Sequence, residues 1–240
     1  MLKSSLFSTC MANKMSVKKQ RYDLIRKIKR LRKKNDITTV FVCGYGGAGK
    51  TTFCNYLLSK LEPNAVLFEC DWFLKYATFV RRAQIKTALE SGNARRIIEE
   101  ENPKNWYDWM LLTTSLKTLM EERSLTLEKA WSQETGNKDL DVKISLPTEP
   151  GSVIIVDGIY LLHDTIRDIA DHIVLLEVPI THCIETSTNR DAHRSTKSYL
   201  EYKVSLLFKY DKPYFQELKN FADTVVEMPV QELKSSTQKS

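Results

Sequence analysis

Residues 38–51 decide the fold, and they read Thr-Thr-Val-Phe-Val-Cys-Gly-Tyr-Gly-Gly-Ala-Gly-Lys-Thr. The first six residues form an unbroken run of β-branched, aromatic and apolar side chains, which predicts a strand buried on both faces. This run breaks at Gly44, and a helical pattern follows from Thr51 to about Leu61, before Pro63. A strand that leads through a glycine-rich loop into a helix predicts an α/β protein whose loop binds an anion.

The loop itself carries a phosphate-binding signature. Residues 44–51 match the pattern G-x-x-x-x-G-K-[ST] in full. In such a loop the backbone N–H groups and the N-terminus of the following helix bind phosphate oxygens. Lys50 is placed to reach the β- and γ-phosphates of ATP, and Thr51 offers its hydroxyl to Mg²⁺. The predicted nucleotide-binding residues are Gly44, Tyr45, Gly46, Gly47, Ala48, Gly49, Lys50, Thr51 and Thr52.

The rest of the chain alternates apolar strands with helical patterns, which predicts a doubly wound, five-stranded parallel sheet with helices on both faces. The further strands are expected at 65–69, 153–157, 173–178 and 224–227. Helical patterns cover about 78–100, 106–123 and 181–220. Residues 132–152 contain Thr135-Gly136-Asn137 and two prolines, a composition typical of a loop or a hairpin.

Positive charge is concentrated at the N-terminus. Residues 1–36 hold 12 Lys/Arg and 2 acidic residues, whereas the remaining residues hold 24 and 28. The body is therefore mildly acidic, which excludes a uniformly basic nucleic-acid-binding domain. Apolar residues at helical spacing predict a short basic helix in this segment: Tyr22, Ile25, Ile28 and Leu31. This helix either packs on the body or serves an acidic partner, a membrane surface or targeting to an organelle.

Cysteine usage and hydropathy favour a cytoplasmic location. The five cysteines are scattered and show no metal-ligand spacing, which suits a reducing compartment. No stretch approaches the 18 or so uncharged apolar residues that a membrane helix needs. Targeting to an organelle by the basic N-terminus remains the alternative.

Two aspartates follow predicted strands and are candidates for chemistry. Asp157 ends the strand Val-Ile-Ile-Val-Asp, a Walker-B-like placement for a magnesium ligand. Asp71 follows the strand at 65–69, where a carboxylate can accept the proton of a hydroxyl nucleophile, although an aspartate here can also cap a helix. Arg190 and Arg194 are four residues apart, so they share one helix face that either binds phosphate or is solvated.

These residues together resemble the uridine kinase–phosphoribulokinase family of P-loop kinases, and most of all its uridine kinase branch. The resemblance runs from about residue 38 to 229. Besides the phosphate loop, it rests on the following segments: Asp71-Trp72-Phe73, Asn102-Pro103 with Asp108, Val156-Asp157-Gly158-Ile159, Arg190-Asp191 with Arg194, and Ala222-Asp223-Thr224-Val225-Val226. The chain departs from the family at 131–137, where Trp-Ser-Gln-Glu-Thr-Gly-Asn replaces a Tyr-Asp-Phe segment near the base.

The resemblance implies a P-loop kinase fold with a helical lid, in a domain over 37–230 between a basic extension (1–36) and a polar tail (231–240). It implies ATP- and Mg²⁺-dependent phosphorylation of a small-molecule hydroxyl, first of all a nucleoside. The alternatives are pantothenate, glycerate or a sugar phosphate as acceptor, or a regulatory P-loop NTPase. The roles it implies are catalysis by Asp71, Lys50, Arg190 and Arg194, substrate binding by Asp71, Tyr76, Tyr107 and Asp108, and metal binding by Thr51 and Asp157.

Overall fold

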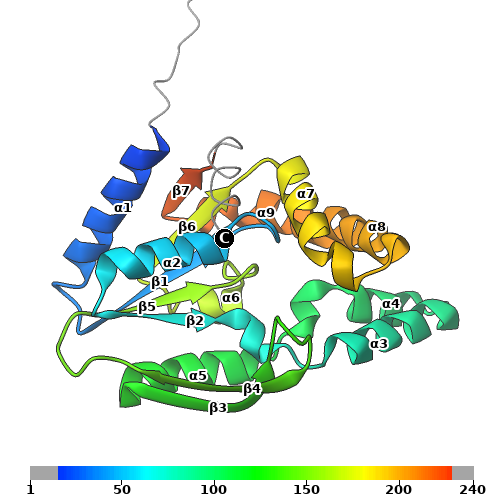
Figure 1. Ribbon diagram of the computed structural model, residues 1–240, viewed down its shortest axis with the longest axis horizontal. Coiled ribbons are helices and arrows are strands. Elements are labelled where there is room, and N and C mark those ends of the chain that lie inside the picture. The colour runs from blue at the N-terminus through cyan, green and yellow to red at the C-terminus, as the bar shows by residue number, and fades with distance from the viewer. Residues whose placement is uncertain (1–15, 229–240) are drawn as a thin grey trace, which may run out of the picture.

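The computed structural model describes residues 16–228, and at its centre lies a parallel sheet of five strands (Figure 1). The strands are β1 (Ile37–Cys43), β2 (Ala65–Glu69), β5 (Ser152–Asp157), β6 (His172–Glu177) and β7 (Thr224–Glu227). Their order in the sheet is β2-β5-β1-β6-β7, and every neighbouring pair is parallel. The predicted doubly wound α/β architecture is confirmed.

Alternate residues of β1 enter two different apolar layers. Val40 and Val42 lie in the layer covered by α1 (Val17–Leu31) and α2 (Lys50–Leu61). Phe41 and Cys43 point to the opposite layer, which contains α5 (Trp109–Glu122) and α9 (Lys212–Leu218). Both faces of the sheet are therefore covered, as a strand of continuous apolar residues requires.

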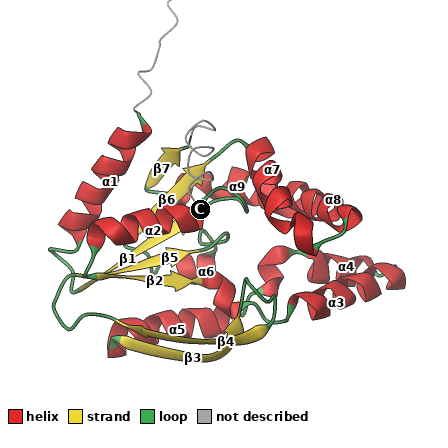
Figure 2. Ribbon diagram, viewed as in Figure 1, coloured by secondary structure: helices red, strands yellow, loops and turns green. Residues whose placement is uncertain are grey.

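A two-stranded antiparallel hairpin lies outside the main sheet (Figure 2). Its strands are β3 (Ser124–Trp131) and β4 (Lys138–Ser145), and their apolar side chains join the core around α5. The sequence indicated a loop or a hairpin only from residue 132 onward. It missed β3 because α5 runs almost directly into that strand, with a single residue between them, Arg123, in the left-handed conformation.

Two pairs of helices stand at one end of the molecule, facing each other (Figure 1). The first pair is α3 (Thr78–Ser91) and α4 (Ala94–Glu101), which the sequence predicted as one helix; Gly92, with φ of 65°, ends the first of them. The second pair, α7 (Ile180–Asp191) and α8 (Lys197–Leu206), forms the lid. The sequence predicted a helical region over about 181–220, and within it Thr196 caps α8 and begins a new helix. A short helix, α6 (Asp164–Arg167), completes the set.

The basic helix α1 packs on the body of the protein. Its buried residues are Val17, Leu24 and Ile28, whereas Tyr22, one of the apolar residues that predicted the helix, is 60% exposed. The helix contacts β7, α2 and β1. Residues 1–15 and 229–240, including the predicted polar tail, lie outside the described residues. In the described part, no helix combines the length and the apolar character needed to cross a bilayer.

Candidate active site

The predicted phosphate loop lies between β1 and α2. Gly49 precedes the first turn of α2 with φ of 79°, and Gly47 has φ of 84°. A Cβ at Gly47 would collide with the carbonyl oxygen of Cys183 in α7, so only glycine fits this close approach. The Lys50 Nζ donates a hydrogen bond to the Tyr45 carbonyl at 3.1 Å, across the loop. The arrangement presents the loop backbone and the N-terminus of α2 to one cavity.

Acidic side chains gather at the carboxyl ends of the central strands. In the sheet register, Asp157 lies opposite Val42 of β1 and Glu69 of β2. The Thr51 hydroxyl donates to Asp157 Oδ2 at 2.7 Å, which joins the loop to β5. A hydroxyl and a carboxylate beside a phosphate loop are oxygen donors that suit Mg²⁺. These residues therefore fit a divalent cation carried by a nucleotide.

The protonation of this acidic group reflects its burial. Asp157 is 7% exposed, and burial raises the pKa of its carboxyl, while Lys50 and the Thr51 hydrogen bond oppose that rise. Burial, with the neighbouring charges of Asp157 and Asp71, raises the pKa of Glu69 to about 7. A nearby cation would favour the ionised forms of both groups. Glu69 was placed at a strand end by the sequence but was given no role there.

Asp71 lies two residues beyond β2 and lines the same cavity. It sits in a short turn, Cys70–Phe73, whose N-cap position belongs to Glu69. Its Oδ1 accepts a hydrogen bond from the Tyr107 hydroxyl at 2.8 Å. Tyr107 is 5% exposed, and burial beside Asp71 raises its pKa well above the ordinary value, so it remains a donor. The carboxylate is thus held in a fixed orientation at the cavity wall.

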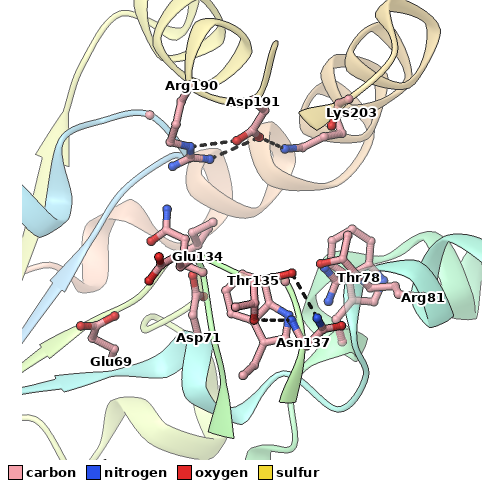
Figure 3. Close-up of a pocket in the computed structure, with 18 of the residues that line it drawn as sticks. Glu69, Asp71, Thr78, Arg81, Glu134, Thr135, Asn137, Arg190, Asp191 and Lys203 are labelled. Carbon is pink, nitrogen blue, oxygen red and sulfur yellow. Dashed lines mark hydrogen bonds and ion pairs between the residues drawn. The ribbon is translucent and has the colours of Figure 1, made fainter. Parts of the chain in front are cut away.

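The cavity has a volume of about 630 Å³ and is lined by residues from several elements (Figure 3). One end is formed by the phosphate loop with Glu69 and Asp157. The other is formed by α3 and the turn of the hairpin, residues 132–137. We call these the nucleotide end and the acceptor end. This volume falls in the range of small-molecule binding sites.

The lid contributes a row of linked charges. Arg190 Nε lies 3.1 Å from Asp191 Oδ1, and the Lys203 ammonium pairs with Asp191 Oδ2 (Figure 3). Arg190 is half-exposed and lines the cavity. The side chain of Arg194 lies outside the described part of the structure, so its lid role stays a prediction.

The comparisons with known proteins agree with this geometry. Residues 39–229 match the Phosphoribulokinase / Uridine kinase family. The chain belongs to this family. It is therefore a nucleotide-binding P-loop kinase, a phosphotransferase that acts on a hydroxyl acceptor.

The relatives are distant in sequence. The uridine kinase of Ureaplasma urealyticum is 25% identical over 163 residues, which cover 67% of this chain and 72% of the relative. The uridine kinase of Staphylococcus epidermidis is also 25% identical, over 201 residues covering 80% and 88%. The structure of D-glycerate 3-kinase from Cryptococcus neoformans shares the fold, with a TM-score of 0.56 and 14% identity over 86% of this chain and 89% of that one. Fold alone does not choose between such acceptors.

Not every residue expected from the family pattern reaches the cavity. Tyr76 is 44% exposed and does not line it. Asp108 is also outside it, because its carboxylate caps α5 by accepting a hydrogen bond from the Leu111 N–H at 3.0 Å. Tyr107, also expected to bind substrate, donates its hydroxyl hydrogen to Asp71 and lines a second cavity that also contains Asp71, and its contact with substrate stays a prediction.

Several residues outside the set predicted to bind substrate line the acceptor end. They are Arg81 and Arg82 of α3, Trp106, and Trp131 with Asn137 at the two ends of the hairpin turn. The adjacent arginines in the helix after Asp71 and the departure from the family at 131–137 were the available signals. Their convergence depends on the packing of three separate elements, which residue spacing alone does not reveal.

Proposed function

We propose that this kinase transfers the γ-phosphoryl group of ATP, bound with Mg²⁺, to a hydroxyl of a nucleoside or a similar ring-bearing alcohol. The observation that carries the proposal is the position of Asp71, fixed by Tyr107 in the cavity that the phosphate loop also lines. The uridine kinases among the relatives support a nucleoside as the first acceptor to test. We place this activity in the cytoplasm, where scattered cysteines stay reduced.

In this mechanism Asp71 aligns the acceptor hydroxyl and takes its proton. The hydroxyl oxygen forms a bond to the γ-phosphorus while the bond from that phosphorus to the β,γ-bridging oxygen breaks. The products are a phosphate monoester, ADP and a proton. Mg²⁺ held through Thr51 and Asp157 would supply positive charge at the phosphates.

The remaining side chains act by position and charge. Lys50 would leave the Tyr45 carbonyl for the β- and γ-phosphates, where its ammonium stabilises the charge of the transferring group. Arg190 would turn from Asp191 toward the same oxygens when the lid closes. A closed lid excludes water and so limits hydrolysis of ATP.

The experiment measures ADP formation at varied Mg²⁺, with and without uridine, for the wild type and Asp157→Asn. We expect acceptor-dependent turnover, and a higher Mg²⁺ requirement in the variant because it loses a carboxylate at the cation site. Asp168→Asn, at an exposed position beside α6, is the matched control and should behave as wild type. ADP formation that ignores every acceptor would instead favour a regulatory NTPase.

A further inference from the structure

Arg81 is a buried cation that forms no direct ion pair with any described residue. It lies on α3, it is 8% exposed, and it lines the acceptor end of the cavity. Within residues 16–228 its guanidinium makes no hydrogen bond or ion pair, and its Nη1 is fully buried. Its guanidinium carbon lies 4.6 Å from the centroid of the Trp106 ring. Burial lowers the pKa of Arg81, while the nearby Tyr199, Tyr107 and Asp71 oppose that shift. Burying a charge without an ion pair raises the free energy of the folded protein, unless a bound ligand supplies the opposite charge.

Arg82 extends the same cationic site toward the lid. Its Nη2 donates to the Ser195 hydroxyl at 3.0 Å, and its guanidinium stacks on Tyr199 of α8, 3.8 Å from the ring centroid. Its Nε is buried and has no partner among the described residues. Both arginines line the cavity. Binding at this end therefore involves the lid as well as α3.

The hairpin turn places neutral polar groups beside these arginines. The Thr78 N–H donates to the Gly136 carbonyl at 2.8 Å, which docks the turn on the start of α3. Figure 3 shows Arg81, Thr78 and Asn137 together on one side of the cavity and Glu69 on the other. The acidic residue of the turn, Glu134, is exposed and forms no ion pair with Arg81. The acceptor end thus offers positive charge and polar groups.

We infer that the acceptor carries an anionic group, a carboxylate or a phosphate, which binds Arg81 and Arg82 while its hydroxyl meets Asp71. The guanidinium fork suits the paired oxygens of either group. A wholly neutral acceptor would leave the buried guanidinium unpaired, and a site built for such a contact discriminates strongly against a ligand that lacks it. This inference rests on the proposed kinase activity and narrows its substrate class.

The first test compares acceptors in matched neutral and anionic pairs: glycerol and glycerate, pantothenyl alcohol and pantothenate, ribose and ribose 5-phosphate, and uridine with and without a ring carboxylate. For the pair that the enzyme uses, we expect kcat/KM to favour the anionic member by roughly 100-fold. Arg81→Gln should lower kcat/KM for the anionic member far more than for the neutral member, and so remove most of that preference. Arg95→Gln, which removes the same charge from the exposed face of α4, should keep it.

A wild-type preference for the neutral member, or an equal loss for both members in Arg81→Gln, would overturn the inference. Either result would leave the kinase proposal intact, because acceptor-dependent ADP formation would still be seen. Thermal unfolding of each variant reports on folding. If Arg81→Gln unfolds, Arg81→Lys replaces it in the test. Lysine keeps the positive charge but lacks the paired N–H donors of the guanidinium, so this variant should reduce the anion preference about 10-fold.

The second test does not depend on finding the acceptor. With the phosphate loop saturated by a non-hydrolysable ATP analogue and Mg²⁺, inorganic phosphate and acetate are titrated separately by calorimetry. The ion that resembles the anionic group of the natural acceptor should bind the wild type. Arg81→Gln should bind that ion at least about 10-fold more weakly. Equal affinity of the wild type and the variant for both ions would refute the inference. If binding depends on Arg81 but no acceptor stimulates ADP formation, the anion site stands and the kinase proposal fails.

Discussion

The two ends of the cavity are built in different ways. At the nucleotide end, backbone groups of one continuous loop and the first turn of one helix form the site, with carboxylates at the ends of adjacent strands. At the acceptor end, single side chains from α3, the hairpin turn and the lid converge from distant parts of the chain. The first kind of site is a local property of the sequence, and the second is a property of tertiary packing.

The two ends also differ in charge. The nucleotide end holds the acids Glu69 and Asp157, which a cation would balance. The acceptor end holds Arg81 and Arg82, which an anion would balance. Asp71 lines the same cavity as the residues of both ends, so the two bound ligands would react beside it. Substitutions at each end should therefore affect different steps of the reaction.

The largest effect is expected for Asp71→Asn. It removes the proton acceptor with little change of shape, so kcat should fall by about 10²–10⁴-fold while nucleotide affinity stays nearly constant. Single-turnover kinetics and titration with a fluorescent ATP analogue measure the two quantities. Asp168→Asn serves as the control. Retention of more than about a tenth of the wild-type rate under conditions where chemistry limits it would show that the base lies elsewhere.

The next largest effect is expected for Lys50→Ala, which acts on the nucleotide end. Loss of its ammonium should lower kcat/KM for ATP by about 10²–10³-fold, because that charge stabilises the transferring phosphoryl group. Thermal unfolding should change little, since within residues 16–228 the Lys50 side chain makes only one hydrogen bond, to the Tyr45 carbonyl. The control is Lys60→Ala, an exposed lysine near the end of the same helix. Unchanged steady-state kinetics in Lys50→Ala would contradict the assignment of the phosphate loop.

This difference between the ends explains how much the sequence could predict. The loop at 44–51, the alternation of strands and helices, and the strand-end position of Asp157 all depend on neighbours in the chain, and the structure places them as expected. The order of the strands in the sheet was not predicted. Arg81 and Asn137 belong to segments 56 residues apart in sequence, and nothing local marks them as neighbours. Asp108 is the opposite case. It matches the family motif and was expected to bind substrate, but its carboxylate caps α5.

A smaller effect is expected for Tyr107→Phe, which tests whether Tyr107 orients Asp71 between the two ends of the cavity. The variant keeps the buried ring but loses the hydrogen bond that orients Asp71. A hydrogen bond to a charged group contributes about 1.5 kcal/mol, so kcat should fall roughly 10-fold. Nucleotide affinity should be unaffected. Tyr22→Phe, at an exposed site on α1, is the control, and a wild-type kcat in Tyr107→Phe would remove the orienting role.

The smallest effect on rate is expected for Ile28→Ala in α1. Ile28 is fully buried against the sheet layer opposite α5, so its truncation should lower the free energy of unfolding by about 2–4 kcal/mol. Because α1 contributes no residue to the cavity, kcat at a temperature well below unfolding should be unchanged. Chemical denaturation measures the first quantity, with Tyr22→Ala as the exposed control. Wild-type stability in Ile28→Ala would mean that α1 does not rely on this packing.

The most direct test of the central claim follows the phosphorus atoms themselves. The full chain is incubated with ATP, Mg²⁺ and each acceptor of the matched pairs, and ³¹P NMR records the products. The account predicts that the γ-phosphate signal is replaced by one phosphate monoester signal, in equal amount to the ADP formed, and that Asp71→Asn slows this conversion by about 10²-fold or more. Conversion of ATP to ADP and inorganic phosphate alone, with every acceptor unchanged, would contradict it.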